Sequence, residues 1–136
     1  VVTTPQDLAI ADAQKGIAMF NKVNIPVLGL VENMSFYQCT ECGHKDYVFA
    51  KDGGNLLAER YNLPLLGALP LDVRIREHAG SGEPLLVSEP DSPLSDVYRE
   101  MARAVSFELA TTVPVAADQG RNIKGDPIAF NPLTDS

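Results

Sequence analysis

The chain has 136 residues, 18 of them acidic and 11 basic, so its formal net charge is −7 at pH 7. At about 100 to 200 residues per domain, this length predicts one compact unit that buries a sizeable core. Proteins that bind duplex nucleic acid present a basic surface to the phosphates, so the acidic balance argues against a nucleic-acid partner.

Neither a membrane span nor a signal peptide is predicted. No apolar run approaches the roughly 18 residues that a membrane helix needs, and the first ten residues lack the charged start of a signal peptide. We therefore expect a soluble, cytoplasmic chain without membrane contact. Two cysteines are too few for a disulfide framework, and the spacing Cys39-x-x-Cys42 suggests metal or redox chemistry in a cytosolic protein.

Two helices have clear start signals. In the first, Thr4 is the expected N-cap and Pro5 the first helical residue, with apolar residues at helical spacing as far as Phe20 or Asn21. The second starts at Ser92-Pro93 and continues to about Thr112, and we expect it to cover one face of a sheet. Residues 113–136 have no periodicity and are predicted to be a tail without regular structure.

A parallel sheet is predicted from a unit that occurs twice. Short apolar runs at 27–31 and 65–69 are typical of strands buried on both faces, and each follows a predicted helix, the second at about 55–61. A helix followed by a buried strand, repeated, predicts an α/β fold with right-handed crossovers. The long connection at about 34–53 holds aromatic residues around Cys39 and Cys42, which predicts two short strands flanking a knuckle.

The carboxyl ends of parallel strands form one rim, where ligands bind. Asn33 follows one strand and can bind a purine base through its amide, or simply satisfy backbone groups. Pro70 follows the second strand, so only its position suggests that its carbonyl lies near a base. Asp72 either accepts a hydrogen bond from a ribose or base, or caps the helical stretch 73–77, and capping is the simpler expectation. Arg74 and Arg76 are expected to be solvated charges, and His78 an exposed side chain.

The Cys39-x-x-Cys42 pair supplies two thiolates, whereas a zinc ion or a four-iron cluster normally takes four ligands. Either His44 and another group complete the set, or a second copy brings its own pair to a symmetric dimer axis. A zinc knuckle and a thioredoxin-type dithiol are the alternatives.

No catalytic residue is predicted. The sequence lacks the G-x-x-x-x-G-K-[ST] loop that cradles phosphates, so this chain alone should not hydrolyse a nucleotide. It also lacks a Gly-x-Ser-x-Gly elbow or a convincing base for the cysteines.

Together these motifs resemble the Mrp-type (ApbC-like) iron-sulfur cluster carrier ATPases, relatives of the MinD and ParA P-loop proteins. The resemblance covers about three quarters of the chain and fades near Val105. It is carried by residues 2–6, the run 31–35, the cysteine pair with Gly43-His44, residues 69–72 and the pair 75–76, in this order.

The resemblance implies a Rossmann-like, three-layer P-loop NTPase fold, with residues 1–112 as its carboxyl-terminal part and 113–136 as the tail. It implies a carrier that holds a [4Fe-4S] cluster between two subunits through Cys39 and Cys42 and passes it to apo-proteins. Asn33 matches the residue that recognises adenine, and Pro70 with the residues after it matches the loop against the base.

The Walker A loop and the acidic residues that bind Mg²⁺ belong, by this resemblance, to a segment preceding Val1. ATP binding and hydrolysis are thus expected of a longer parent, and the sheet is expected to be incomplete, with an exposed edge. Two alternatives stay open at this point: a zinc-stabilised knuckle in a nucleotide-binding regulatory module, and an inactive truncated fragment.

Overall fold

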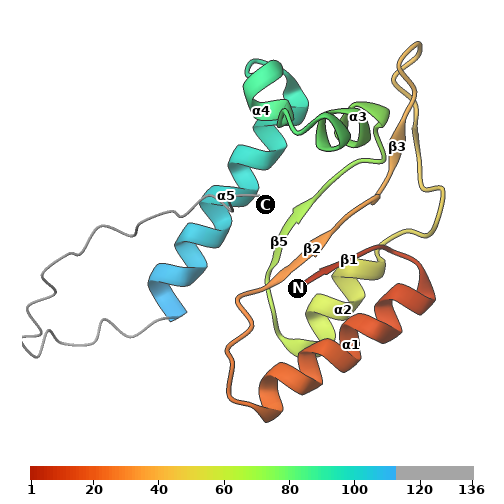
Figure 1. The fold of residues 1–136 in the computed structure, drawn as a ribbon. Coiled ribbons are helices and arrows are strands. Elements are labelled where there is room, and N and C mark those ends of the chain that lie inside the picture. Colours follow the sequence, from red (N-terminus) through yellow and green to blue (C-terminus); the bar gives the residue numbers. More distant parts are fainter. Residues whose placement is uncertain (113–136) are drawn as a thin grey trace, which may run out of the picture.

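A computed structural model describes residues 1–112 of the chain; the predicted tail at 113–136 lies outside the described residues. The centre of the described part is a parallel sheet with the strand order β1-β2-β5 (Figure 1). The strands are β1 (Val2–Thr3), β2 (Leu30–Glu32) and β5 (Leu65–Ala68). Val2 pairs with Val31, and Leu30 pairs with Leu65. The predicted α/β class with a parallel sheet is therefore confirmed.

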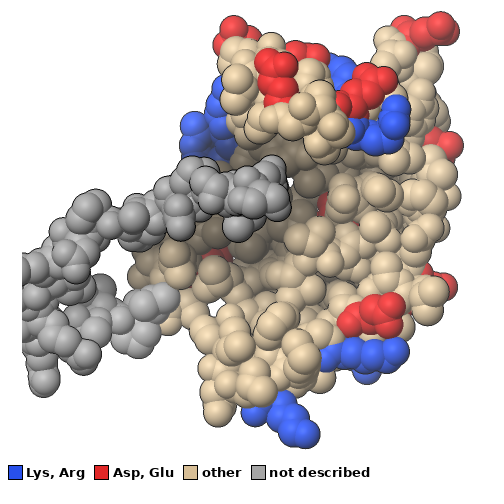
Figure 2. Space-filling model, viewed as in Figure 1, with Lys and Arg blue, Asp and Glu red and all other residues tan. Residues whose placement is uncertain are grey.

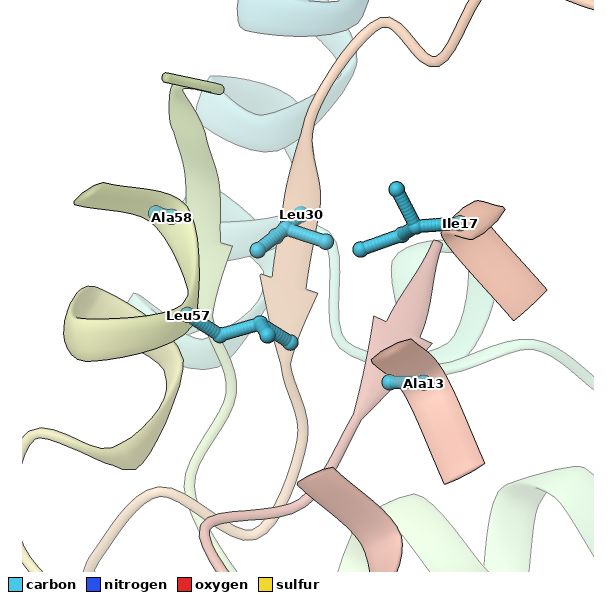
Figure 3. Close-up of a cluster of buried hydrophobic side chains, with 5 residues drawn as sticks. All are labelled: Ala13, Ile17, Leu30, Leu57 and Ala58. Carbon is cyan, nitrogen blue, oxygen red and sulfur yellow. The ribbon is translucent and has the colours of Figure 1, made fainter. Parts of the chain in front are cut away.

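Helices lie on both faces of this sheet. Helices α1 (Asp7–Lys22) and α2 (Gly53–Tyr61) cover one face, where Leu30 is fully buried (Figure 1). Figure 3 shows the side chains that form this core; they are Ala13, Ile17, Leu30, Leu57 and Ala58. Helix α5 (Pro93–Thr112) packs on β5 so closely that a Cβ on Gly67 would lie 3.2 Å from Met101. Because neighbouring strand residues face opposite sides, the central strand contributes to both layers.

The start of α1 differs from the prediction. The helix begins at Asp7 with Gln6 in the N-cap position, and it continues to Lys22. Thr4 is not the cap; its hydroxyl donates to Gln6 Oε1 at 3.4 Å. Pro5 is buried before the helix, and a Cβ on Gly53 would lie only 3.0 Å from Pro5 Cα. Packing of Pro5 against the start of α2 therefore determines where α1 begins, and local sequence signals do not predict such a tertiary contact.

The start of α5 agrees with the prediction. The backbone N–H of Ser95 donates to Ser92 Oγ at 3.2 Å, which satisfies one of the unpaired donors of the first turn. The helix includes Pro93 and reaches Thr112, as expected from the spacing of its apolar residues.

Three shorter features complete the described part. A two-stranded antiparallel ribbon is formed by β3 (Tyr37–Gln38) and β4 (Lys45–Asp46), as the sequence predicts. Helix α3 (Val73–Ser81) is longer than the predicted stretch 73–77, and α4 (Leu85–Ser88) leads into α5. None of the helices within residues 1–112 combines the length and apolarity required to cross a bilayer.

Candidate functional site

The carboxyl ends of the three parallel strands meet at one edge of the sheet. The backbone N–H of Asn33 donates to Thr3 O at 2.7 Å, and that of Leu69 donates to Glu32 O at 2.8 Å. The carboxyl ends of β1, β2 and β5 are thus held side by side. Thr3, Asn33 and Pro70 consequently share the rim at which open α/β sheets bind ligands.

Asn33 is half-buried at this rim, and its side chain already has a local role. The backbone N–H of Met34 donates to Asn33 Oδ1 at 2.9 Å, while Met34 itself has a φ of 56°. Asparagine commonly stabilises such a turn through its side-chain oxygen. The oxygen keeps a second lone pair, so the turn and a base contact are compatible.

Asp72 caps α3. Its Oδ1 accepts from the backbone N–H of Arg74 at 2.9 Å, and its Oδ2 pairs with Arg74 Nη2 at 2.8 Å. The hydrogen bond from the Arg74 guanidinium lowers the pKa of the Asp72 carboxyl below its ordinary value. Capping, the simpler expectation, is thus what the described residues show for this side chain.

Two expectations about α3 are wrong. Arg74 is not a solvated charge, because its guanidinium also pairs with Glu89 Oε2 at 3.2 Å. His78 is not exposed; its Nδ1 lies 3.0 Å from Ser88 Oγ and its Nε2 lies 3.6 Å from Glu89 Oε1. Figure 2 shows acidic and basic side chains mixed over this region of α3 and α4. Arg76, with a side chain 81% exposed, is solvated as expected.

Replacing Asp72 by Ala should destabilise the chain by about 1 kcal/mol at pH 7, the usual effect of removing an N-cap. Because the folded-state pKa of Asp72 is lowered, its contribution is complete above the ordinary carboxyl pKa of about 3.9 and disappears as the pH falls through the folded-state value. Urea unfolding at pH 7 and at pH 3 measures both effects.

The matched control is Asp12→Ala, which removes an exposed pair with Lys15 at 3.2 Å. Exposed pairs contribute little, so this variant should unfold like the wild type. Equal effects of the two substitutions would contradict the cap at Asp72.

Glu32 is a residue of this site that none of the sequence motifs singles out. This carboxylate ends the central strand and is only 4% exposed. Its Oε1 accepts from Ser35 Oγ at 2.5 Å, and its Oε2 accepts from the backbone N–H of Gly54 at the start of α2. A glutamate that closes an otherwise apolar strand was the available signal. The carboxylate connects β2, the turn after it and α2, and it satisfies one of the unpaired donors of the helix.

Gly54→Ala tests this packing. A Cβ at position 54 would lie 2.7 Å from Glu32 Oε2 and 3.0 Å from Glu32 Cβ, so the carboxylate would have to move. Such overpacking costs about 1–3 kcal/mol, which urea unfolding would detect. Gly16→Ala is the control, because nothing lies within 4 Å of its Cβ position in α1; it should stabilise by about 0.5–1 kcal/mol. A Gly54→Ala chain as stable as the wild type would contradict the tight contact.

The cysteine pair lies at the tip of the β3–β4 ribbon. The tip closes with two backbone hydrogen bonds of 2.9 Å, from Cys39 N to His44 O and from Gly43 N to Cys39 O. Gly43 has a φ of 72°, a conformation that favours glycine. Cys39 is half-buried, Cys42 is exposed, and neither forms a disulfide.

The turn favours a thiolate at Cys39. The backbone N–H groups of Cys42 and then Glu41 donate to the Cys39 sulfur and lower its pKa, with a smaller contribution from the Cys42 side chain. Since the thiolate is the form that binds metals, the turn prepares one ligand. His44 is exposed, and residues 1–112 gather no group of three Cys, His, Asp or Glu side chains able to hold a metal ion.

The ribbon is joined directly to the rim. Ser35 N donates to Leu69 O at 2.9 Å, and Leu71 N donates to Phe36 O at 2.7 Å, so the chain after β2 stays paired with the loop around Pro70. A cavity of about 230 Å³ between them is lined by Phe36, Gln38 and Lys45 from the ribbon and by Pro70, Asp72 and Arg74 from the loop and α3. The two predicted sites are therefore linked, because the segment from Asn33 to Cys39 is hydrogen-bonded to the loop around Pro70.

Comparison with known proteins then decides the family. The model described as ParA, NUBPL iron-transfer P-loop NTPase, matches residues 1–106. The chain belongs to this family. The resemblance found in the sequence is thereby confirmed.

Curated relatives in this family carry consistent names. An iron-sulfur cluster carrier protein from Pseudomonas fragi is 51% identical over 102 residues, which cover 75% of this chain and 36% of that protein. The iron-sulfur cluster transfer protein NUBPL of Mus musculus is 48% identical over 82% of this chain and 35% of its own length. The chain thus spans about a third of the length of these relatives.

Solved structures agree with the fold. A nucleotide-binding protein from Archaeoglobus fulgidus, in complex with ADP, is 31% identical over 67% of this chain and 36% of that chain, with a TM-score of 0.54. The septum site-determining protein MinD from Pyrococcus horikoshii, complexed with Mg-ADP, has a TM-score of 0.60 at 20% identity, over 84% of this chain and 44% of that chain. The latter likeness concerns the fold alone.

Proposed function

We propose that this chain is the cargo-holding part of an iron-sulfur cluster carrier, in which Cys39 and Cys42 hold one side of a [4Fe-4S] cluster and a second copy holds the other. The observation that carries the proposal is the position of the two thiols at the tip of the ribbon, where Cys42 is exposed and Cys39 is half-buried. Relatives that are 48% to 51% identical and named for cluster carriage or transfer support it.

The chemistry of the ribbon tip suits a cluster that is first bound and later transferred to another protein. The turn lowers the pKa of Cys39, which favours the thiolate, the form of cysteine that binds iron. Cys42 is exposed, so an incoming thiolate of an apo iron-sulfur protein can approach the iron. Each cysteine then departs as a thiolate when the client thiolate takes its place, and the exchange needs neither an oxidant nor a reductant.

Two thiolates per chain also explain why a homodimer is proposed. A four-iron cluster takes four cysteine ligands, and the described residues offer no third metal ligand beside the pair. Two copies related by a two-fold axis supply four equivalent sulfurs. The expected cytoplasmic location stays a prediction.

Cys39→Ala should abolish both cluster uptake and cluster-dependent dimerisation. Anaerobic loading with iron and sulfide, followed by absorption spectroscopy, iron and sulfide counting and analytical ultracentrifugation, measures both. Wild type should turn brown and dimerise with two irons per chain, half a four-iron cluster. The control is His44→Ala, which removes an exposed neighbour and should load like the wild type.

Other outcomes would contradict the carrier proposal. Stoichiometric zinc without a chromophore, lost in His44→Ala, would favour the zinc knuckle. A dimer that persists unchanged in Cys39→Ala would place the contact elsewhere.

The rim around Asn33, Pro70 and Asp72 is proposed to contact the base of ATP when a Walker A loop and its Mg²⁺ are supplied by a longer chain. The half-buried Asn33 lies at the switch from β2 to the ribbon, and a relative from Archaeoglobus fulgidus is recorded with ADP. Asp72 would contribute mainly by fixing the loop, because its carboxylate is engaged with Arg74.

In a chain that carries the Walker A loop, Asn33→Ala should weaken ATP about tenfold while leaving tripolyphosphate, which has no base, unaffected. The reason is that a good bidentate contact to adenine contributes about 1–3 kcal/mol. Calorimetric titration of both ligands measures the difference. Equal weakening of both would show that Asn33 acts only through the turn at Met34.

A further inference from the structure

A pocket of about 310 Å³ opens between helices α3, α4 and α5, and most of its lining is apolar. None of its lining residues belongs to the cavity beside the ribbon, so it is separate from the candidate site. The lining includes Ile75, His78 and Ala79 of α3, Leu85 and Leu86 of α4, and Tyr98 of α5. Exposed apolar surface of this kind on a folded protein marks an interaction site.

Hydrogen bonds between the three helices hold the pocket in shape. His78 Nδ1 lies 3.0 Å from Ser88 Oγ, and this contact joins α3 to α4. Ser95 Oγ donates to Glu89 O at 2.7 Å, which joins α5 to the residue that follows α4. Because the helices are tied at these points, an incoming side chain enters a pocket that is already formed, and little binding free energy is lost to rearrangement.

The surroundings of the pocket are acidic. Residues 72–100 contain seven acidic and three basic residues, a net charge of −4 out of −7 for the whole chain. Arg74 and Arg99 already pair with carboxylates of this region. Glu77 and Glu83 are exposed, and each is next in the chain to a residue that lines the pocket. Figure 2 shows carboxylates exposed at the end of the molecule that α3 and α4 form.

We propose that this pocket docks a basic, amphipathic segment of another protein, which inserts an apolar side chain between the three helices. Ligand pockets have volumes of roughly 300–1,000 Å³, so a pocket of 310 Å³ suits an apolar anchor rather than a large cofactor. An amphipathic helix with anchors at i, i+3 or i+4 is a common form of such a partner.

Charge selects among the occupants. The carboxylates beside the pocket attract lysine or arginine that flanks the anchor. They repel nucleic acids and anionic lipid surfaces, and a second copy of this chain, with its own net charge of −7, fits less well than a basic partner. The inference does not depend on the proposed cluster carriage, because it involves neither cysteine.

The probe is a short, fluorescein-labelled synthetic helix of leucine, lysine and alanine, with its leucines at helical spacing. Fluorescence anisotropy with the full 136-residue chain measures its dissociation constant. Ala79→Trp fills the pocket with an indole and should raise that constant about tenfold, because one apolar side chain can no longer be buried. Leu86→Ser, at a side chain that is 37% exposed, removes an apolar wall and should raise it several-fold.

The contribution of charge is tested separately. Glu77→Gln/Glu83→Gln should weaken peptide binding several-fold at low salt and reduce its salt dependence, since nearby charges are screened by ions. The matched control is Asp12→Asn/Glu59→Gln, which removes two exposed carboxylates on α1 and α2 and should leave binding unchanged. A peptide with glutamate in place of lysine should not bind.

Four results would overturn the proposal. They are a wild type that does not bind the basic peptide, unchanged binding in both Ala79→Trp and Leu86→Ser, and equal weakening by the two pairs of charge substitutions, which would indicate unspecific attraction to an acidic chain. The fourth is an apo wild type that self-associates in analytical ultracentrifugation and loses this in Ala79→Trp, because a second copy would then occupy the pocket.

Failure of the carrier function gives a distinct pattern. All four variants keep both cysteines, so each should take up iron and sulfide like the wild type. A wild type without iron uptake would contradict the carrier proposal and leave peptide binding unaffected. Thermal unfolding checks that each variant is folded.

Discussion

The arrangement of the site depends on one buried carboxylate. Glu32 ends the central strand and accepts hydrogen bonds from Ser35 Oγ and from the backbone N–H of Gly54, so a single side chain joins the strand, the following turn and the start of α2. A charge buried in this way is tolerated only when donors surround it. The turn at the rim is anchored here, because Asn33 directly follows Glu32 and Ser35 donates to its carboxylate.

Much of the fold follows from local patterns, and the exceptions have tertiary causes. The two inner strands, the ribbon and the Ser92 cap were predictable because apolar runs, aromatic residues on both sides of the cysteine pair and cap residues act within a few positions, although the strand expected at 27–31 is formed only by Leu30–Glu32. The start of α1 was not, since Pro5 is placed by its packing against Gly53. The contacts of Arg74 and His78 with Glu89 could not be predicted either. Glu89 follows α4 and comes close to α3 only because the chain folds back between these two helices.

In the candidate site, too, some features were predictable from local sequence and others depend on tertiary contacts. Cysteine spacing identified the knuckle, and the end points of parallel strands identified the rim. What the sequence could not give is their connection, which depends on two backbone hydrogen bonds between the segment after β2 and the loop after β5. Glu32 went unnoticed because a carboxylate is usually exposed, and its burial becomes intelligible only once Gly54 is seen beside it.

The way the ribbon is anchored has a mechanical consequence. Its base is fixed to the loop around Pro70 by the bonds at Ser35 and Leu71, whereas its tip is stabilised only by its own turn. Cys39 follows Asn33 by six positions, a reach of about 20 Å for a fully extended segment. Because the sulfurs lie beyond these bonds, a small rotation of the backbone at the rim would displace them through a larger arc.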